Sequence, residues 1–138
     1  MRGDRLPDQD HISRYCRPKT LQEDGQPSRA SFMLRPNEEF FSVNWLEYLD
    51  LPDRQAQITQ VRQVIRLTLQ ATAKIAVLNV GGILDRVHRN SDRVLAVLHE
   101  PEQDDPTHSG IHGYRHEDDL VADLIAEEVR ETYPAKQT

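Results

Sequence analysis

The chain has 138 residues, of which 37% are hydrophobic, and a formal net charge of −6 at pH 7. This length fits one domain with a single core, and the longest apolar stretch, near residues 75–84, is far too short to cross a membrane as a helix. Residues 98–138 carry three Lys/Arg against eleven Asp/Glu, which argues against nucleic-acid binding through that region and favours a basic protein partner.

The cysteine content and the N-terminus bear on the cellular compartment. Cys16 is the single cysteine, which excludes a disulfide within the chain and a cysteine-based zinc site. The first residues lack the apolar segment of a signal peptide, so we expect a cytoplasmic protein. Residues 1–9 are charged and show no apolar period, which predicts a disordered tail. One domain is expected over residues 10–133, followed by a C-terminal tail over residues 134–138.

The first half of that domain is predicted to hold two strands and a short helix. The strands are expected at 11–17 and 30–35, with a loop rich in Pro and Gly between them. Asn44 and Glu47 have the spacing of a capping box, which predicts a helix over residues 45–50 that ends before Pro52. Trp45 is expected to pack in the core, and an aromatic ligand pocket is the alternative.

The second half is predicted to alternate helices and strands. Apolar residues at three- and four-residue steps predict a helix over 53–72 and another over 117–133. The apolar runs at 74–80 and 92–99 predict buried strands, with a helical turn or two at 82–90 between them, as in a βαβ unit. The expected fold is therefore α+β: one small domain with a mixed four-stranded sheet packed by two main helices.

The segment HEPEQDDPTHSGIHGYRHEDD, residues 99–119, holds four of the six histidines. His108, His112 and His116 stand four apart, a spacing that on a helix would suit zinc or another divalent metal. Pro106 and two glycines oppose a helix, so no metal or other cofactor is predicted. A phosphate or nucleotide contact at the following helix start is a second alternative, but the acidic residues 117–119 would repel it. A polar structural loop is the favoured interpretation.

Two further patterns could carry chemistry. NVGG, residues 79–82, follows a predicted buried strand, but the complete dinucleotide-binding and P-loop patterns are missing, so a tight turn is favoured. An enzyme would instead need a cleft with an acid/base carboxylate from Asp10, Glu38 or Glu47. The cluster predicted around such a cleft, within a few ångströms, consists of His108, His11, Arg14 and Arg35. His11 and Arg14 are three apart on one strand, which places them on opposite faces.

Three segments resemble a group of small uncharacterised bacterial proteins. The matching positions are Asp10, His11, Arg14 and Tyr15; Leu34, Arg35, Glu38, Ser42, Val43, Trp45, Leu46 and Glu47; and Pro106, His108, Ile111 and Gly113. The resemblance covers nearly the whole chain and implies a bacterial accessory protein encoded beside antiviral defence or toxin–antitoxin genes. It also favours His108 over the neighbouring histidines as a functional residue.

Together these observations predict a small acidic interaction protein, antitoxin-like or a subunit of a defence system. Its expected binding surfaces are the acidic helix over residues 117–133 and the region around Trp45, and an oligomer is left open. The alternative is a nucleotide-processing or metal-dependent enzyme with a site around His108, His11 and Arg14.

Overall fold

The computed structural model describes residues 2–65 and 69–136, and within these ranges it holds six strands, three α-helices and three 3₁₀ helices. In chain order these are β1 (His11–Cys16), η1 (Pro18–Thr20), η2 (Arg29–Phe32), β2 (Phe41–Trp45), η3 (Leu46–Leu49), α1 (Arg54–Val64), β3 (Lys74–Asn79), α2 (Val80–Asn90), β4 (Ala96–His99), β5 (His108–His112), α3 (Asp119–Glu127) and β6 (Glu131–Pro134). No helix within the described ranges is long and apolar enough to cross a membrane.

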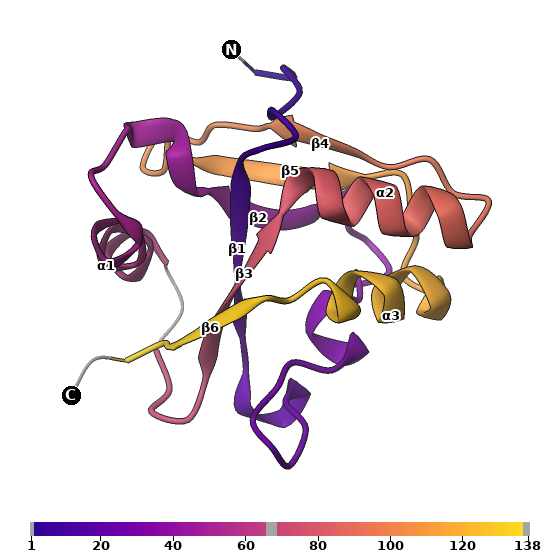
Figure 1. The fold of residues 1–138 in the computed structure, drawn as a ribbon, viewed down its shortest axis with the longest axis horizontal. Coiled ribbons are helices and arrows are strands. Elements are labelled where there is room, and N and C mark those ends of the chain that lie inside the picture. The colour runs from indigo at the N-terminus through magenta and orange to yellow at the C-terminus, as the bar shows by residue number, and fades with distance from the viewer. Residues whose placement is uncertain (1, 66–68, 137–138) are drawn as a thin grey trace.

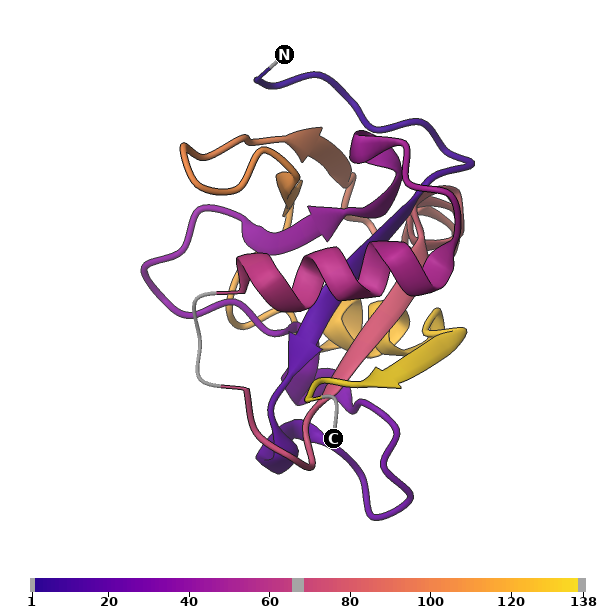
Figure 2. The same ribbon diagram turned by 90° about the vertical axis from the view of Figure 1, so that its left-hand side faces the viewer.

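The strands form one sheet in the order β4-β5-β2-β1-β3-β6, and each neighbouring pair is antiparallel. Helix α1 covers one face, which we call the α1 face, whereas α2 and α3 cover the other (Figures 1 and 2). Side chains of β3 alternate between two cores: Ile75 and Val77 pack with α1, and Ala76 and Leu78 pack with α2 and α3. The α+β class is therefore confirmed. Within the described residues, a six-stranded antiparallel sheet and three α-helices replace the predicted mixed four-stranded sheet and two main helices.

The pairing of β1 positions the candidate site. β1 pairs with β3 along its whole length, from His11 opposite Asn79 to Cys16 opposite Lys74. Its pairing with β2 covers only Ile12 and Ser13, so the two strands diverge after Ser13. This divergence opens a gap in the middle of the sheet, on the α1 face, and polar side chains fill it.

Several predicted elements differ from those in the structure. Residues 30–35 lie partly in the 3₁₀ helix η2 rather than a strand, because the Ser28 side chain accepts a hydrogen bond from Ala30 N and caps it. Helix α1 is capped by Asp53, as expected, but ends at Val64. Residues 69–73 are not helical, and residues 66–68 of the predicted helix lie outside the described ranges. Helix α3 also ends early, and the strand β6 follows it.

The predicted βαβ unit at 74–98 is wrong as a parallel pair. β3 and β4 are separated in the sheet by β1, β2 and β5, and the helical segment between them is longer than predicted, at 11 residues. Of the strands that separate them, β5 lies in a segment predicted as a polar loop, whereas β2 comes just before the predicted 45–50 helix and overlaps it only at Trp45. Most of that predicted helix is present as the 3₁₀ helix η3.

Both chain ends contact the sheet. Leu6 N donates to Val97 O at 3.0 Å, His99 N donates to Asp4 O at 2.8 Å, and Leu6 is buried. Part of the predicted N-terminal tail therefore lies along β4 and covers its outer edge, where an unpaired strand would be open to aggregation. At the other end Ala135, in the predicted C-terminal tail, is buried and bonded to Ala73.

Candidate functional site

A cavity of about 180 Å³ lies on the α1 face where β1 and β2 diverge. Its floor is a row of polar side chains on three neighbouring strands. The strand register places Ser13 of β1 opposite Asn44 of β2, and Asn44 opposite His108 of β5, so these side chains lie side by side on one face. Val64 and Ile65, at the end of α1, form part of the wall. We call this the histidine cavity.

Ser13 has a buried hydroxyl group without a partner. The residue is 1% exposed, and its Oγ forms no hydrogen bond with any residue that the structure describes. By contrast Ser109 of β5 is 0% exposed and donates to Thr107 O at 3.1 Å. Burying an unpaired hydroxyl costs about 1–3 kcal/mol. Ser13 is among the residues that line the histidine cavity, although its Oγ itself has almost no accessible surface.

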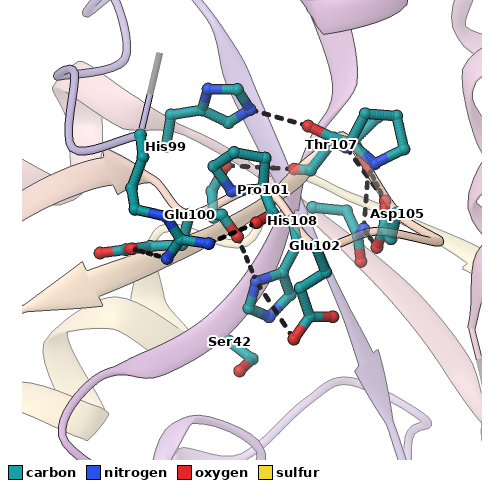
Figure 3. A network of polar contacts seen from close by, with 12 residues as sticks. Ser42, His99, Glu100, Pro101, Glu102, Asp105, Thr107 and His108 are labelled. Carbon is teal, nitrogen blue, oxygen red and sulfur yellow. Dashed lines mark hydrogen bonds and ion pairs between the residues drawn. The ribbon is translucent and has the colours of Figure 1, made fainter.

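One ring nitrogen of His108 forms a hydrogen bond within the protein, and the other does not. Its Nδ1 lies 2.8 Å from Glu100 O (Figure 3), and because a carbonyl only accepts, Nδ1 must carry the proton. Nε2 is then the basic nitrogen, and it has no hydrogen-bond partner among residues 2–65 and 69–136. The Glu102 carboxylate lies 4.0 Å from Nδ1.

The loop between β4 and β5 is held to the floor by buried polar contacts. Asn44 Nδ2 donates to Asp105 Oδ2 at 2.6 Å and to Thr107 Oγ1 at 2.9 Å. The Thr107 hydroxyl in turn donates to Asp105 Oδ1 at 2.6 Å, and His99 Nε2 donates to Pro106 O at 2.7 Å (Figure 3). Both amide hydrogens of Asn44 are thus used within the protein, while its Oδ1 accepts no hydrogen bond from a described residue.

Arg14 occupies the gap between the diverging strands. Its Nη1 donates to Ser42 O at 3.0 Å, and its Cζ lies 4.1 Å from the centroid of the Phe41 ring. Its Nε is buried and has no acceptor within the described residues. Burial lowers the pKa of Arg14 from its ordinary value, although Cys16 and Glu38 act in the opposite direction. Arg14 lines the histidine cavity and also a second cavity of about 230 Å³.

The structure brings together only part of the predicted catalytic cluster. Arg14 lies with His108 in the histidine cavity and with Arg35 in the second cavity. His11 lies at the other end of β1, where its Nδ1 is 2.7 Å from Glu47 Oε2, and it lines neither cavity. The prediction that all four residues converge is therefore wrong for His11, because it begins the strand and Arg14 lies three positions further along.

The three carboxylates predicted as acid/base candidates are all engaged elsewhere. Glu47 accepts from His11, Asp10 Oδ2 accepts from Trp45 Nε1 at 2.8 Å, and Glu38 Oε1 accepts from the backbone N of Arg35 at 2.7 Å. The indole of Trp45 packs against Tyr48 and His99. Trp45 is thus half-buried beside the core, as the core-packing interpretation expects.

The other histidines of the predicted metal set form separate contacts. His112 shares a face of β5 with His108, but its Nε2 lies 2.9 Å from Glu100 Oε2, and Phe40 covers Gly110 between the two. His116 lies beyond the strand and pairs with Glu117. No group of three or more His, Cys, Asp or Glu side chains in the described ranges could hold a metal ion. A β-strand, not the predicted loop, separates the histidines.

The NVGG segment begins a helix but offers no open phosphate site. Asn79 caps α2 by accepting from Gly82 N at 2.8 Å. A Cβ on Gly82 would meet the Glu128 carboxylate, and one on Gly81 would meet the backbone of Asp8. The start of α2 is therefore covered by an acidic side chain and by the N-terminal segment.

The acidic surface of α3 is largely paired with arginines of the same chain. Arg86 lies 2.9 Å from Glu127 and 2.8 Å from Glu128. Arg93 lies 3.0 Å from Asp118, and Arg29 lies 3.4 Å from Asp119 and 3.7 Å from Asp123. These contacts leave less free negative charge for a basic partner than the sequence indicates.

Most polar residues of the histidine cavity were not among the residues predicted from sequence. They are Ser13, Ser42, Asn44, Glu102 and Asp105. One signal was present, because β2 alternates Phe41, Val43 and Trp45 with Ser42 and Asn44. Alternation of this kind marks a strand with one polar face, and it would have placed Ser42 and Asn44 on the same side.

Comparison with known proteins gives no relative. No protein-family model, no curated protein and no solved structure matches the chain significantly. The resemblance to small bacterial proteins therefore stays a prediction, and the function must be argued from the site itself.

Proposed function

We propose that the protein binds a small polar molecule in the histidine cavity, with His108 Nε2 as the acceptor or base that contacts it. The observation that carries this proposal is the row formed by Ser13, Asn44 and His108. Each side chain in the row has a hydrogen-bonding atom that no described residue uses, and the three lie next to one another on adjacent strands. Unused polar atoms that converge in a cavity are typical of ligand sites.

The chemistry of the row constrains the ligand. His108 Nε2 and Asn44 Oδ1 both accept hydrogen bonds, whereas the Ser13 hydroxyl can donate or accept. A molecule with hydroxyl or amine groups matches this pattern. At about 180 Å³, the cavity is smaller than the roughly 300 Å³ at which drug-sized sites begin, so it fits a small molecule or one part of a larger one.

The contacts of His108 also support proton transfer. A proton taken up at Nε2 would leave a charged ring whose Nδ1–H is held by Glu100 O and faces the Glu102 carboxylate. Such orientation by a second group is what a general base requires. Of the predicted enzyme site, His108 and Arg14 line this cavity, whereas His11 does not.

The experiment is a binding screen followed by a matched pair of variants. Nucleosides, free amino acids, monosaccharides and small hydroxy acids are screened by thermal shift and ligand-observed NMR. Hits are then titrated against His108→Gln and His112→Gln, since both histidines lie on the same face of β5 but only His108 lines the cavity. We expect His108→Gln to weaken binding about tenfold and His112→Gln to leave it unchanged. Equal effects of the two variants, or no hit, would reject the proposal.

The predicted role as an interaction protein remains a separate prediction. The ion pairs of α3 within the chain weaken the argument that its acidic surface binds a basic partner. The other predicted binding surface, around Trp45, is accessible, since the nearby Tyr48 and Leu49 are 41% and 37% exposed. Size-exclusion chromatography with light scattering, alone and with the product of a neighbouring gene, tests it. A strict monomer without a partner would reject this role.

A further inference from the structure

The second cavity is lined by cationic side chains and hydroxyl groups. Arg14 and Arg17 come from β1 and its end, Lys19 from η1, and Arg35 from the segment after η2. Thr20 and Ser31 also line it, but their hydroxyls already donate to Arg17 O at 2.7 Å and to Thr20 O at 3.1 Å. No Asp or Glu is among the residues that line this cavity. We call it the basic cavity.

The basic side chains form no close ion pair with any residue that the structure describes. None of Arg14, Arg17, Lys19 and Arg35 has a carboxylate oxygen within 4.0 Å among the residues that the structure describes, although most of the other arginines form such pairs. Among these cations, Arg14 has the largest free-energy cost of burial, since its Nε is buried without an acceptor. A buried cation is normally paired.

Burial, more than repulsion between these cations, disfavours the charged form of Arg14. Burial is the main cause that lowers its pKa, and the positive charge of Arg17 lowers it further. Glu38, whose charge raises that pKa, is exposed and already accepts a hydrogen bond from Arg35 N. Several guanidinium and ammonium groups around one cavity are the chemistry that binds an oxyanion.

We propose that the basic cavity binds the phosphate group of a small-molecule ligand. The inference rests on the proposed function in one respect: Arg14 and Tyr15 line both cavities, so the polar remainder of the ligand would enter the histidine cavity. A phosphate fits better than a singly charged carboxylate, because several cations surround the space. The volume of about 230 Å³ and the overall net charge of −6 argue against a nucleic-acid backbone as the occupant.

Inorganic phosphate is the probe, titrated calorimetrically at constant ionic strength. Arg14 itself holds the Ser42 carbonyl, and its replacement could unfold the chain, so the test uses Arg17→Gln, Lys19→Gln and Arg35→Gln. Arg5→Gln is the matched control, because Arg5 is an exposed cation that lines neither cavity. We expect 1:1 binding of phosphate that each cavity variant weakens about fivefold or more, and that Arg5→Gln changes less than twofold.

Three outcomes would overturn the inference. These are the absence of phosphate binding, equal binding of acetate, and tighter binding of a fluorescent oligonucleotide that Arg5→Gln weakens as much as the cavity variants do. The result is separable from the proposed function, since phosphate titration does not involve His108. If phosphate binds but His108→Gln weakens the binding of no screened compound, the phosphate site in the basic cavity is supported and the proposed ligand site in the histidine cavity is rejected.

Discussion

Replacement of Ser13 by alanine should stabilise the fold. The Ser13 hydroxyl is buried and unpaired, and the penalty for such a group is about 1–3 kcal/mol. Alanine removes that group at the cost of the few van der Waals contacts of one oxygen atom. We therefore expect the free energy of unfolding to rise by about 1 kcal/mol, which in a chain of this size corresponds to a Tm about 4 °C higher.

Ser109→Ala is the control for this prediction. It is the same change at a position that is equally buried, but there the hydroxyl donates to Thr107 O. Loss of that hydrogen bond should lower the stability by about 1 kcal/mol. Urea unfolding followed by the fluorescence of Trp45, the single tryptophan, measures both. If Ser13→Ala is destabilised as much as Ser109→Ala, the Ser13 hydroxyl has a partner and the argument from its isolation fails.

Three further predictions test the described contacts. Tyr114→Phe should lower the free energy of unfolding by about 1–2 kcal/mol, because the buried Tyr114 hydroxyl donates to Phe32 O at 2.6 Å; an unchanged urea midpoint would contradict this. Cys16 is 1% exposed and burial raises the pKa of its thiol, so Ellman's reagent should react with it only on unfolding, and rapid reaction of the native protein would contradict this burial. Burial acts to raise the pKa of Glu131, but hydrogen bonds from Tyr133 and Arg54 outweigh it and lower the pKa. Because the folded pKa lies below the unfolded value of about 4.3, the contribution of Glu131 is present above that pH and is lost as the pH falls through the folded pKa. Glu131→Gln should therefore lose less stability between pH 6 and pH 3 than the wild type in urea titrations, and equal losses would reject the assignment.

The sequence predicts the elements whose pattern is local. β1 was found from its alternating pattern, β3 from a short apolar run, and the start of α1 from the Asp53 cap. The ends of the helices were placed too late, because apolar residues at helical spacing continue into segments that pack differently, such as Val129 beyond α3.

The site could not be predicted in the same way, because it depends on sheet order. Ser13, Asn44 and His108 come together only since β2 and β5 lie next to β1, and these pairings join residues up to 95 positions apart, from Ser13 to His108. The glycine and proline residues around His108 indicated a loop, yet Gly110 lies within β5, where the Phe40 ring leaves no space for a side chain. His11 was included by residue type alone, and it lies at the other end of β1, beside Glu47, where it lines neither cavity.

Chemical-shift mapping by ¹H–¹⁵N NMR tests the central claim most directly. The spectrum of the uniformly labelled protein is recorded with each screening hit, together with a long-range spectrum of the histidine rings. We predict that the amide shifts gather at Ser13, Asn44 and His108, that the free His108 ring carries its proton on Nδ1, and that its Nε2 resonance moves on binding. Amide shifts gathered elsewhere, or a His108 ring protonated at Nε2 and insensitive to every ligand, would contradict the account.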